Sequence, residues 1–409
     1  MNVALTTPYF DPLAVVAGKS GRPRRGHLPL LGVGYLAGAL KARGHQVVFV
    51  DAVSKGLDVP SIAGMLRETH PDLVGISCIS TQAAEKAYAL ARALREALGS
   101  VPLVMGGAHV TSFGGLVLDQ CPELDAVIPG EGELVFAELA DALAKGLGPK
   151  DVRGLIYRAN DGTITETEAA PFTDDLDKIP FPDRSIYDHA HFRPLTNLGM
   201  DTTQPATAVI TSRGCPWNRC RFCFRGGYYQ SKYRRRSPEN VVAEVRDVVR
   251  NCRVRQIKFL DDNFCVNERW VTRFCDLIDR ERLGISWAVL GRVDTVTETM
   301  LKRMARSGCR SVQYGIESGN QELLDLIDKG ITLEQTRRAV TLAKRAGLSV
   351  MGFCILGLPT ETPAMTGKTV DFACSLNIDY MFFAPYHPFD GTVLAEMADC
   401  RTIDLKKTA

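Results

Sequence analysis

The sequence has no long apolar run and almost no net charge. No stretch of about 18 consecutive residues is apolar throughout, so a membrane-spanning helix is excluded. Lys+Arg number 49 and Asp+Glu number 47, and this balance argues against a chain whose main partner is nucleic acid or an anionic membrane. Wholesale disorder is excluded as well, because 45% of the 409 residues are hydrophobic.

The start of the sequence also lacks the features that would predict a secretory leader. The first residues carry neither a cationic segment nor a long apolar segment, so we expect a cytoplasmic protein. In that compartment the 12 cysteines are not expected to form disulfides. Most of the scattered cysteines sit among apolar residues and are expected to be small buried hydrophobes.

The first 150 residues alternate short apolar strands with helices. The expected strands are 3–5, 47–50, 73–77, 103–105 and 126–128, and the expected helices are 31–43, 82–98 and 133–145. This alternation is typical of an α/β fold with a doubly wound, Rossmann-like parallel sheet. Such sheets bind ligands beyond the carboxyl ends of their strands.

A second α/β region follows a hairpin and a linker rich in Pro and Asp. We divide the chain into a first domain (1–150), the hairpin and linker (151–200), a second domain (201–395) and a short tail (396–409). The expected strands of the second domain are 208–211, 256–260, 286–289, 311–315, 350–355 and 379–384, and its expected helices are 238–251, 268–280, 298–307, 321–327 and 333–346. Six strand–helix units predict a (β/α)6 partial TIM barrel with its site at the carboxyl ends of the strands.

Three cysteines crowd together just after the first barrel strand. Cys215, Cys220 and Cys223 form the pattern CxxxxCxxC. Three thiolates on one loop can hold three irons of a [4Fe–4S] cluster and leave the fourth iron open to a small molecule. The alternatives are chance and zinc, but zinc would want a fourth Cys or His nearby. The next cysteine is Cys252, and no histidine lies between residues 192 and 386.

With this loop the chain resembles the radical S-adenosylmethionine (SAM) superfamily, and more narrowly the cobalamin-binding radical SAM enzymes, over nearly its whole length. The usual motif of that family is CxxxCxxC, so the first gap here is one residue longer, while all three ligands are present. The resemblance places Phe222 beside the adenine of SAM. It implies further SAM contacts at the later strand ends, from Asp261, Asp262, Arg292, Glu317, Ser318, Gly352 and Gly357.

Several of these residues also have a structural interpretation. Segment 261–263 could be a helix N-cap before Glu268, Arg292 could be a surface arginine, and the glycines of 352–357 could permit tight turns. Four such features in chain order, each at an expected strand end, favour the SAM interpretation. The basic and aromatic segment 228–238 could contact RNA. Its end, however, is explained by Ser237 as an N-cap and Pro238 as the first helical residue.

The first domain resembles the cobalamin-binding domain of the same family. The residues that the resemblance assigns to the cofactor lie mainly at strand ends: Gly34, Ser77, Ser80, Thr81, Gly106, Gly107, His109, Gly130 and Glu131. Glycines there let backbone approach a bulky ligand, and helix N-termini favour its phosphate. The motif DxHxxG, which gives cobalt a histidine in other cobalamin proteins, is absent. His109 is therefore expected to contact backbone or the cofactor tail rather than cobalt.

The resemblance implies an enzyme that forms a 5′-deoxyadenosyl radical from SAM and methylates an unactivated carbon of a small-molecule or peptide biosynthetic intermediate. It also implies an external electron donor such as flavodoxin or ferredoxin, and neither a membrane nor a nucleic acid as partner. Tyr386 and His387, past the sixth strand, are the candidate catalytic residues, and a structural histidine is the alternative.

Three rival functions stay open. The first is radical cyclisation, rearrangement or oxidation without methyl transfer. The second is a tRNA methylthiotransferase, which would carry three cluster cysteines in the first domain and an RNA-binding domain at the end. Here the first domain has only Cys78 and Cys121, and 18 residues follow Gly391. The third is a non-enzymatic cobalamin or Fe–S sensor, which SAM cleavage would exclude.

Overall fold

The computed structural model describes residues 1–9, 27–194, 200–224, 232–389 and 392–397. The chain forms two compact units, Met1–Phe192 and Arg193–Ala409. Residues 228–231 of the basic and aromatic segment 228–238, and residues 398–409 of the expected tail, lie outside the described residues. In the described ranges, no helix combines the length and the apolar character that crossing a membrane requires.

The first unit is built on one mostly parallel sheet with the strand order β2-β1-β3-β4-β5-β6-β7. Its strands are β1 (Asn2–Thr6), β2 (Gln46–Val50), β3 (Leu73–Ser77), β4 (Leu103–Gly106), β5 (Ala126–Ile128), β6 (Ile156–Arg158) and β7 (Ile164–Glu166). The first five are parallel, and the β6–β7 hairpin adds to β5 in the antiparallel sense. The hairpin expected within residues 151–200 is therefore part of this sheet.

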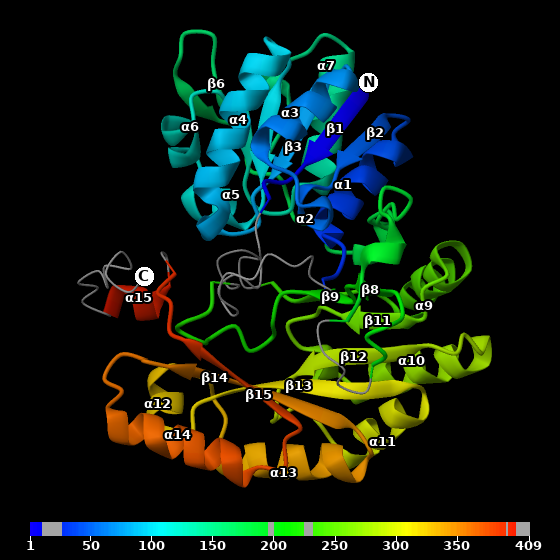
Figure 1. The fold of residues 1–409 in the computed structure, drawn as a ribbon, viewed down its shortest axis with the longest axis vertical. Helices are drawn as coiled ribbons and strands as arrows, with labels where there is room; N and C mark the ends of the chain where they lie inside the picture. The colour runs from blue at the N-terminus through cyan, green and yellow to red at the C-terminus, as the bar shows by residue number, and fades with distance from the viewer. Residues whose placement is uncertain (10–26, 195–199, 225–231, 390–391, 398–409) are drawn as a thin grey trace. The chain divides into compact units, whose positions relative to one another are not determined.

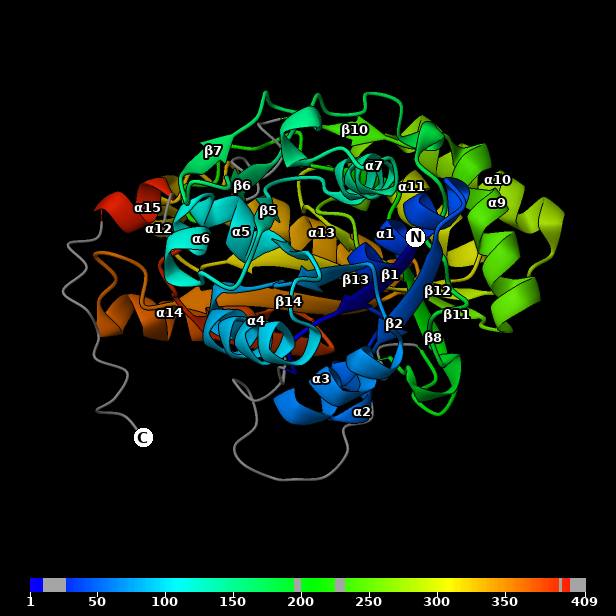
Figure 2. The ribbon, with the colours of Figure 1, turned by 90° about the horizontal axis from the view of Figure 1, so that it is seen from above.

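Helices cover both faces of the first sheet, as a doubly wound fold requires. They are α1 (Leu31–Ala42), α2 (Ala52–Lys55), α3 (Val59–Glu68), α4 (Ala84–Leu98), α5 (Ala108–Phe113), α6 (Leu116–Gln120) and α7 (Glu133–Ala144). Figure 2 shows α1 and α7 on one face and α3 and α4 on the other, and each pair packs on its own apolar cluster. The sequence did not predict α2, α3, α5 or α6.

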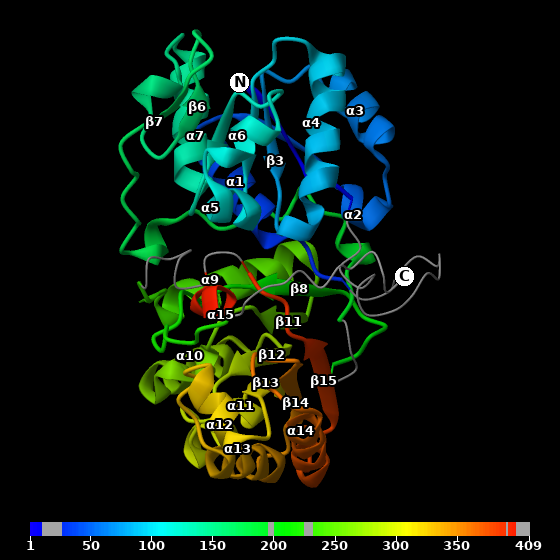
Figure 3. The same cartoon turned by 90° about the vertical axis from the view of Figure 1, so that its left-hand side faces the viewer.

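The second unit is built on a parallel sheet of six strands in sequential order. They are β8 (Ala206–Val209), β11 (Gln256–Phe259), β12 (Ser286–Gly291), β13 (Cys309–Glu317), β14 (Ser349–Leu356) and β15 (Tyr380–Pro385). Strands β8 and β15 form its two edges, and β15 is visible at one of them in Figure 3. This open, all-parallel arrangement confirms the predicted partial barrel.

The helices of the second unit pack along one side of this sheet (Figure 1). They are α9 (Pro238–Asp247), α10 (Glu268–Glu281), α11 (Glu298–Arg306), α12 (Gln321–Leu326), α13 (Leu333–Arg345) and α14 (Pro363–Ser375), with the short α15 (Val393–Met397) after the last strand. Between helices and strands lies one apolar cluster that includes the fully buried Trp287 and Phe259. The inner face of the strands and their carboxyl ends are thereby left for a site.

Two helices of the second unit differ from expectation. The expected helix 238–251 begins as predicted, since the Ser237 hydroxyl accepts a hydrogen bond from the Asn240 N–H at 3.1 Å, but it changes at Val248–Cys252 into one wider turn. Helix α14 was not predicted, because its sequence contains a glycine and two threonines and has little amphipathic pattern. The Thr362 cap and Pro363 were the signals that could have located it.

Candidate functional site

The three clustered cysteines lie on one loop beyond β8 and the two-residue strand β9 (Ser212–Arg213). Cys215 and Cys220 are half-buried, Cys223 is exposed, and none of the three forms a disulfide. In the described part of the chain, no three Cys, His, Asp or Glu side chains converge closely enough to hold a single metal ion. A [4Fe–4S] cluster needs no such convergence, because each thiolate binds a different iron. Three cysteines on one loop, none of them in a disulfide, therefore fit the cluster.

Asp261 holds the strand end from which this loop begins. One of its carboxylate oxygens accepts hydrogen bonds from the Thr211 N–H at 3.0 Å, the Thr211 hydroxyl at 2.8 Å and the Ser212 hydroxyl at 2.6 Å. The residue is 1% exposed, and burial raises the pKa of its carboxyl. Its second oxygen has no hydrogen-bond partner among the described residues. Asp261 thus fixes the strand end from which the cysteine loop begins.

The loop is docked on a turn from a distant part of the sequence, residues 326–330, which we call the seating turn. The Trp217 indole N–H donates to the Asp328 carbonyl at 2.8 Å. The Arg221 N–H and guanidinium donate to the carbonyls of residues 327 and 326, at 2.9 and 3.1 Å. The Arg219 guanidinium also meets the Asp328 carboxylate at 3.2 Å. The residues between the cluster cysteines therefore serve as the anchor of the loop.

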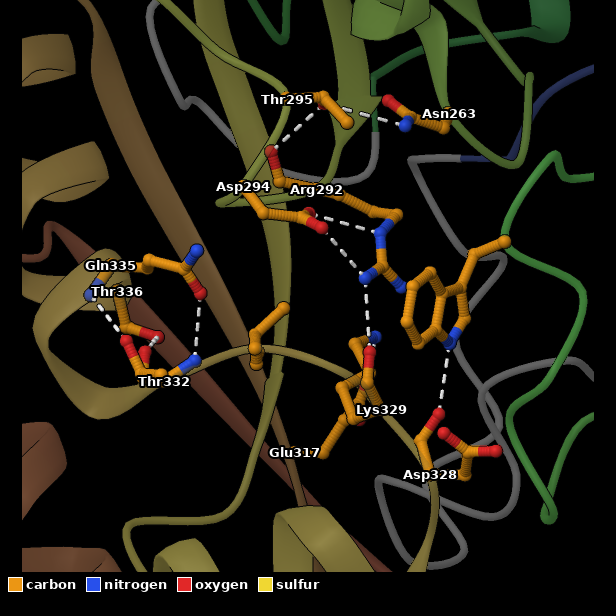
Figure 4. A network of polar contacts seen from close by, with 12 residues as sticks. Asn263, Arg292, Asp294, Thr295, Glu317, Asp328, Lys329, Thr332, Gln335 and Thr336 are labelled. Carbon is orange, nitrogen blue, oxygen red and sulfur yellow. Dashed lines mark hydrogen bonds and ion pairs between the residues drawn. The ribbon is translucent and has the colours of Figure 1, made fainter.

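Arg292 and Gly330 enclose the Trp217 ring. The Arg292 guanidinium lies 4.8 Å from the ring centroid. Gly330 has φ +66°, and a Cβ there would stand 1.9 Å from a carbon of the ring, so this position must be glycine. Arg292 is 6% exposed, so the alternative of a surface arginine is wrong. As Figure 4 shows, its fork binds the Asp294 carboxylate and one nitrogen donates to the Lys329 carbonyl at 2.9 Å.

Glu317 and Lys329 form a buried ion pair beside the cluster loop. The Lys329 ammonium donates to a Glu317 carboxylate oxygen at 2.6 Å and lies 5.9 Å from the centroid of the Phe222 ring. Burial alone would lower the pKa of Lys329, but the negative charges of Glu317 and Cys220 outweigh it, so the pKa is raised. Burial raises the pKa of the Cys220 thiol to about 11, against the positive charges of Lys329 and Arg292.

The other expected SAM residues lie at the strand ends where they were predicted, and several are held by the protein. The Ser318 hydroxyl accepts from the Asn320 N–H at 3.1 Å and pairs with Thr369. A side chain at Gly352 would meet its neighbours at 2.7 Å, so this glycine serves close packing. Gly357 has φ +79°, so its glycine permits the backbone to turn there. Phe222 packs on the barrel core, and Asp262 is half-buried at the end of β11.

The alternative of an N-cap at 261–263 is only partly right. Helix α10 is capped by Asn267, whose side chain accepts from the Trp270 N–H. Asn263 instead caps a short turn before it by accepting from the Cys265 N–H at 3.0 Å. The acidic residues 261 and 262 therefore cap no helix.

The two candidate catalytic residues follow β15. The Tyr386 N–H donates to the Leu356 carbonyl at 2.6 Å, which continues the pairing of β15 with β14. His387 is exposed, and its ring lies 5.5 Å from that of Phe389. Their place at a carboxyl strand end agrees with a substrate approach, and their catalytic role stays a prediction.

In the first unit, polar and glycine residues gather at the carboxyl ends of the strands. Thr7, directly after β1, is fully buried, and its hydroxyl has no hydrogen-bond partner among the described residues. Gly107 has φ +105°, and a Cβ there would lie 2.4 Å from the Cys78 carbonyl oxygen. A side chain at Gly130 would stand in open space, whereas a Cβ at Gly106 would contact the Ile128 carbonyl oxygen at 3.5 Å. A buried hydroxyl without a described partner and exposed glycine backbone at the same edge of the sheet fit a large polar ligand there.

The remaining cobalamin candidates have varied surroundings. Ser77 ends β3, Ser80 precedes the turn that begins at Thr81, and Glu131 lies between β5 and α7. Gly34 is different, because a Cβ on this α1 residue would meet the Tyr187 hydroxyl at 3.0 Å. Gly34 therefore serves the packing of α1 against the segment around residue 187.

His109 is held on both sides by the protein. Its Nε2 lies 2.7 Å from the Tyr88 hydroxyl, and that hydroxyl donates to Gln120. Nε2 must therefore carry the proton, and Nδ1, 3.4 Å from the Thr81 hydroxyl, is the acceptor. Burial lowers the pKa of His109, which favours this neutral form. With both nitrogens engaged, the arrangement supports the expectation that His109 does not bind cobalt.

This geometry predicts a loss of stability in acid. Below a pH of about 6.5 an unfolded histidine binds protons that native His109 resists, so the free energy of unfolding falls by up to about 1.4 kcal/mol per pH unit until the native group also titrates. His109→Gln should lessen the fall, and urea unfolding at about pH 7.5 and about pH 5.5 measures it. His27 and His189, whose pKa burial also lowers, are present in both proteins and cancel. An equal fall in the variant would contradict the prediction.

Sequence reasoning missed the seating turn and Trp217. The turn lies more than a hundred residues after the cysteines, and nothing in its own pattern indicates a cluster. The one available signal was the tryptophan inside the first cysteine gap, because a large aromatic residue in a short loop needs a surface to cover it.

Comparisons with known proteins agree with this site. Residues 209–373 match the family model of the Radical SAM superfamily, and residues 22–140 match that of the B12 binding domain. An uncharacterized methyltransferase of Pyrococcus horikoshii is 38% identical over 97% of this chain and 83% of its own length. An anaerobic magnesium-protoporphyrin IX monomethyl ester cyclase of Rubrivivax gelatinosus is 31% identical over 89% of this chain and 65% of its own length, less than two thirds.

A solved structure has the same fold. It is a radical S-adenosylmethionine methyltransferase, TsrM, from Kitasatospora setae with cobalamin and a [4Fe–4S] cluster bound. The TM-score is 0.76 at 21% identity, and the match covers 96% of this chain and 74% of that chain. The likeness therefore covers both units, and at this identity it concerns the fold alone.

Proposed function

The chain belongs to the radical SAM superfamily, in the branch that also carries a B12-binding domain, and from this premise we propose that it methylates an unactivated carbon of a biosynthetic intermediate. The cofactors expected from the sequence, a [4Fe–4S] cluster, SAM and cobalamin, are those of this branch. The single observation that carries the proposal is the loop of three cysteines outside any disulfide at the carboxyl end of a parallel barrel, in one chain with a B12-binding domain.

The cofactors, when bound, supply the chemistry: the cluster and SAM a 5′-deoxyadenosyl radical, and cobalamin a methyl group. The chain's own residues position them. Cys215, Cys220 and Cys223 would hold the cluster, and Asp261 fixes the start of their loop while it keeps one oxygen unbonded among the described residues. Phe222, half-buried against the barrel core, gives an aromatic face next to the last cysteine. In the first unit, Thr7, Gly106 and Gly107 would lie against cobalamin.

The second candidate function is cyclisation or rearrangement without methyl transfer. It is favoured by one observation, the 31% identity to the Rubrivivax gelatinosus cyclase. A methylthiotransferase has less support from the structure. Cys78 and Cys121, which would have to bind a second cluster, are both 0% exposed, and burial raises the pKa of each thiol to about 12.

The products decide between these functions. The anaerobically reconstituted chain is incubated with SAM, reductant, cobalamin and candidate substrates, among them small molecules and peptides, and the mixture is analysed by mass spectrometry. Methylation should give S-adenosylhomocysteine and 5′-deoxyadenosine in about equal amounts with a product one methylene heavier, because one SAM gives the methyl group and another the radical. Deoxyadenosine with substrate consumption but no S-adenosylhomocysteine would replace methylation by cyclisation or rearrangement. Absence of SAM cleavage with every substrate would favour a sensor.

We also propose that a flavodoxin- or ferredoxin-like protein supplies the electron, and that the enzyme acts in the cytoplasm. The near balance of 49 basic and 47 acidic residues gives no large field for a nucleic acid partner. Replacing the chemical reductant with reduced flavodoxin in the assay above tests the electron donor: the same products should form.

A further inference from the structure

We infer that Lys329 is a positioning residue that sets the reduction potential of the cluster, and that Glu317 opposes its effect. The inference rests on the proposed function, because it presumes a cluster on Cys215, Cys220 and Cys223. It goes further by giving an electrostatic role to a residue that lies more than a hundred positions from the cysteine motif.

The first step is the position of the Lys329 charge. Lys329 is 7% exposed, and its ammonium lies 5.9 Å from the ring of Phe222, the residue between two of the cysteines. The turn that carries Lys329 is hydrogen-bonded to Trp217 and Arg221, which flank Cys220, so this charge lies beside the loop that carries the thiolate ligands. A cation that stabilises a thiolate ligand also acts on the irons that the thiolate binds.

The second step is that this charge cannot move away. Lys329 lies in the seating turn, whose carbonyls accept hydrogen bonds from Trp217, Arg221 and Arg292. The loop that would carry the cluster and the turn that carries the ammonium are therefore one connected unit. On its other side the ammonium is held by Glu317 at 2.6 Å. Glu317 itself adopts φ +63°, a backbone conformation that is uncommon for a residue with a side chain.

The third step is the sign of the effect. The oxidised cluster takes one electron from an external reductant and becomes more negative by one charge. A fixed cation nearby stabilises the reduced state, and a fixed anion destabilises it. Both groups are buried, so salt screens them weakly. Lys329 should therefore raise the reduction potential, and Glu317 should lower it.

The test is a redox titration of the anaerobically reconstituted full chain, without SAM, with dithionite as reductant and electron paramagnetic resonance as readout. Lys329→Met should make reduction about tenfold less favourable, which is a potential about 59 mV lower. Lys329→Arg keeps the positive charge, so its reduction potential should lie close to that of the wild type. Glu317→Gln should shift the potential in the opposite direction. Misfolding alone would not produce shifts of opposite sign.

A matched control is the ion pair between Lys344 and Asp379. Its two hydrogen bonds are both 2.7 Å, but it lies where β15 begins, because Asp379 also accepts from the Val350 N–H at the start of β14. This is the amino end of the strands, opposite the cluster loop. Lys344→Met should leave the potential unchanged.

Two results would overturn the inference: shifts of the same sign in Lys329→Met and Glu317→Gln, or no shift in either. If Lys329→Met binds no cluster, the reduction potential of Glu317→Gln decides: a higher potential than in the wild type supports the inference, and an unchanged or lower one overturns it. A wild-type chain without a cluster would overturn both this inference and the proposed function. Opposite shifts in a chain that never cleaves SAM would overturn the proposed function alone.

Discussion

Replacing Cys215, Cys220 and Cys223 together with alanine will abolish the iron–sulfur cluster and, with it, the cleavage of SAM. Anaerobically reconstituted wild-type chain should hold about four irons, and the triple variant should hold none, because no ligand to the cluster remains on the loop. Iron and sulfide analysis measures the first effect, and 5′-deoxyadenosine in the presence of dithionite measures the second. The loss should be complete, since electron transfer to SAM requires the open iron.

The fold should survive this substitution. Cys215 and Cys220 are half-buried and Cys223 is exposed, so three alanines leave no large cavity in the core. The matched control is the double variant Cys252→Ala and Cys374→Ala, which removes the other half-buried and exposed cysteines of the described part of the chain. It should keep its iron. Iron and sulfide retained in the triple variant would show that the cluster is bound elsewhere or not at all.

Much of the fold could be predicted because its strands are short apolar segments bounded by polar residues, glycine or proline. The strands at 73–77 and 126–128 were predicted with the bounds that the structure has. Both lie inside a mostly parallel sheet with a strand on each side and helices on both faces, where burial on two faces demands continuous apolar sequence. The short helices α5 and α6 gave no such signal, since neither is long enough to repeat a helical pattern.

The spacing of residues alone predicts only the part of the candidate site whose members are neighbours in sequence, and strand-end residues such as Asp261 and Glu317 were expected from the family resemblance. The spacing of the three cysteines indicates a cluster by itself. Asp261 and the seating turn contact the cysteine loop from parts of the chain that are distant in sequence. Gly34 is an example of a residue that a sequence motif assigns to the cofactor although the structure uses it for packing. A glycine within a matching family segment looks the same whether it faces a cofactor or, as here, packs on Tyr187. Which of the two applies depends on tertiary contacts that no local pattern encodes.

The docking of the cluster loop can be tested with one methyl group. Gly330→Ala places a Cβ where the Trp217 ring now lies, at 1.9 Å from one of its carbons, so the ring must move and its hydrogen bond to Asp328 is strained or lost. We expect the reconstituted variant to release iron to a chelator much faster than the wild type. We also expect it to unfold more easily by roughly 2–5 kcal/mol, from left-handed strain and overpacking together.

Gly347→Ala separates the two causes. Gly347 has φ +82°, close to the +66° of Gly330, but a Cβ there would meet no atom within 4 Å. This control carries the same kind of backbone strain, roughly 1–2 kcal/mol, without displacing any side chain, so its iron should be released at the wild-type rate. The difference between the two variants is then the contribution of the Trp217 contact to holding the cluster. Equal rates of iron release from the two variants would contradict this prediction. Backbone strain alone would then account for the release, and the contact between Trp217 and the seating turn would contribute nothing to holding the cluster.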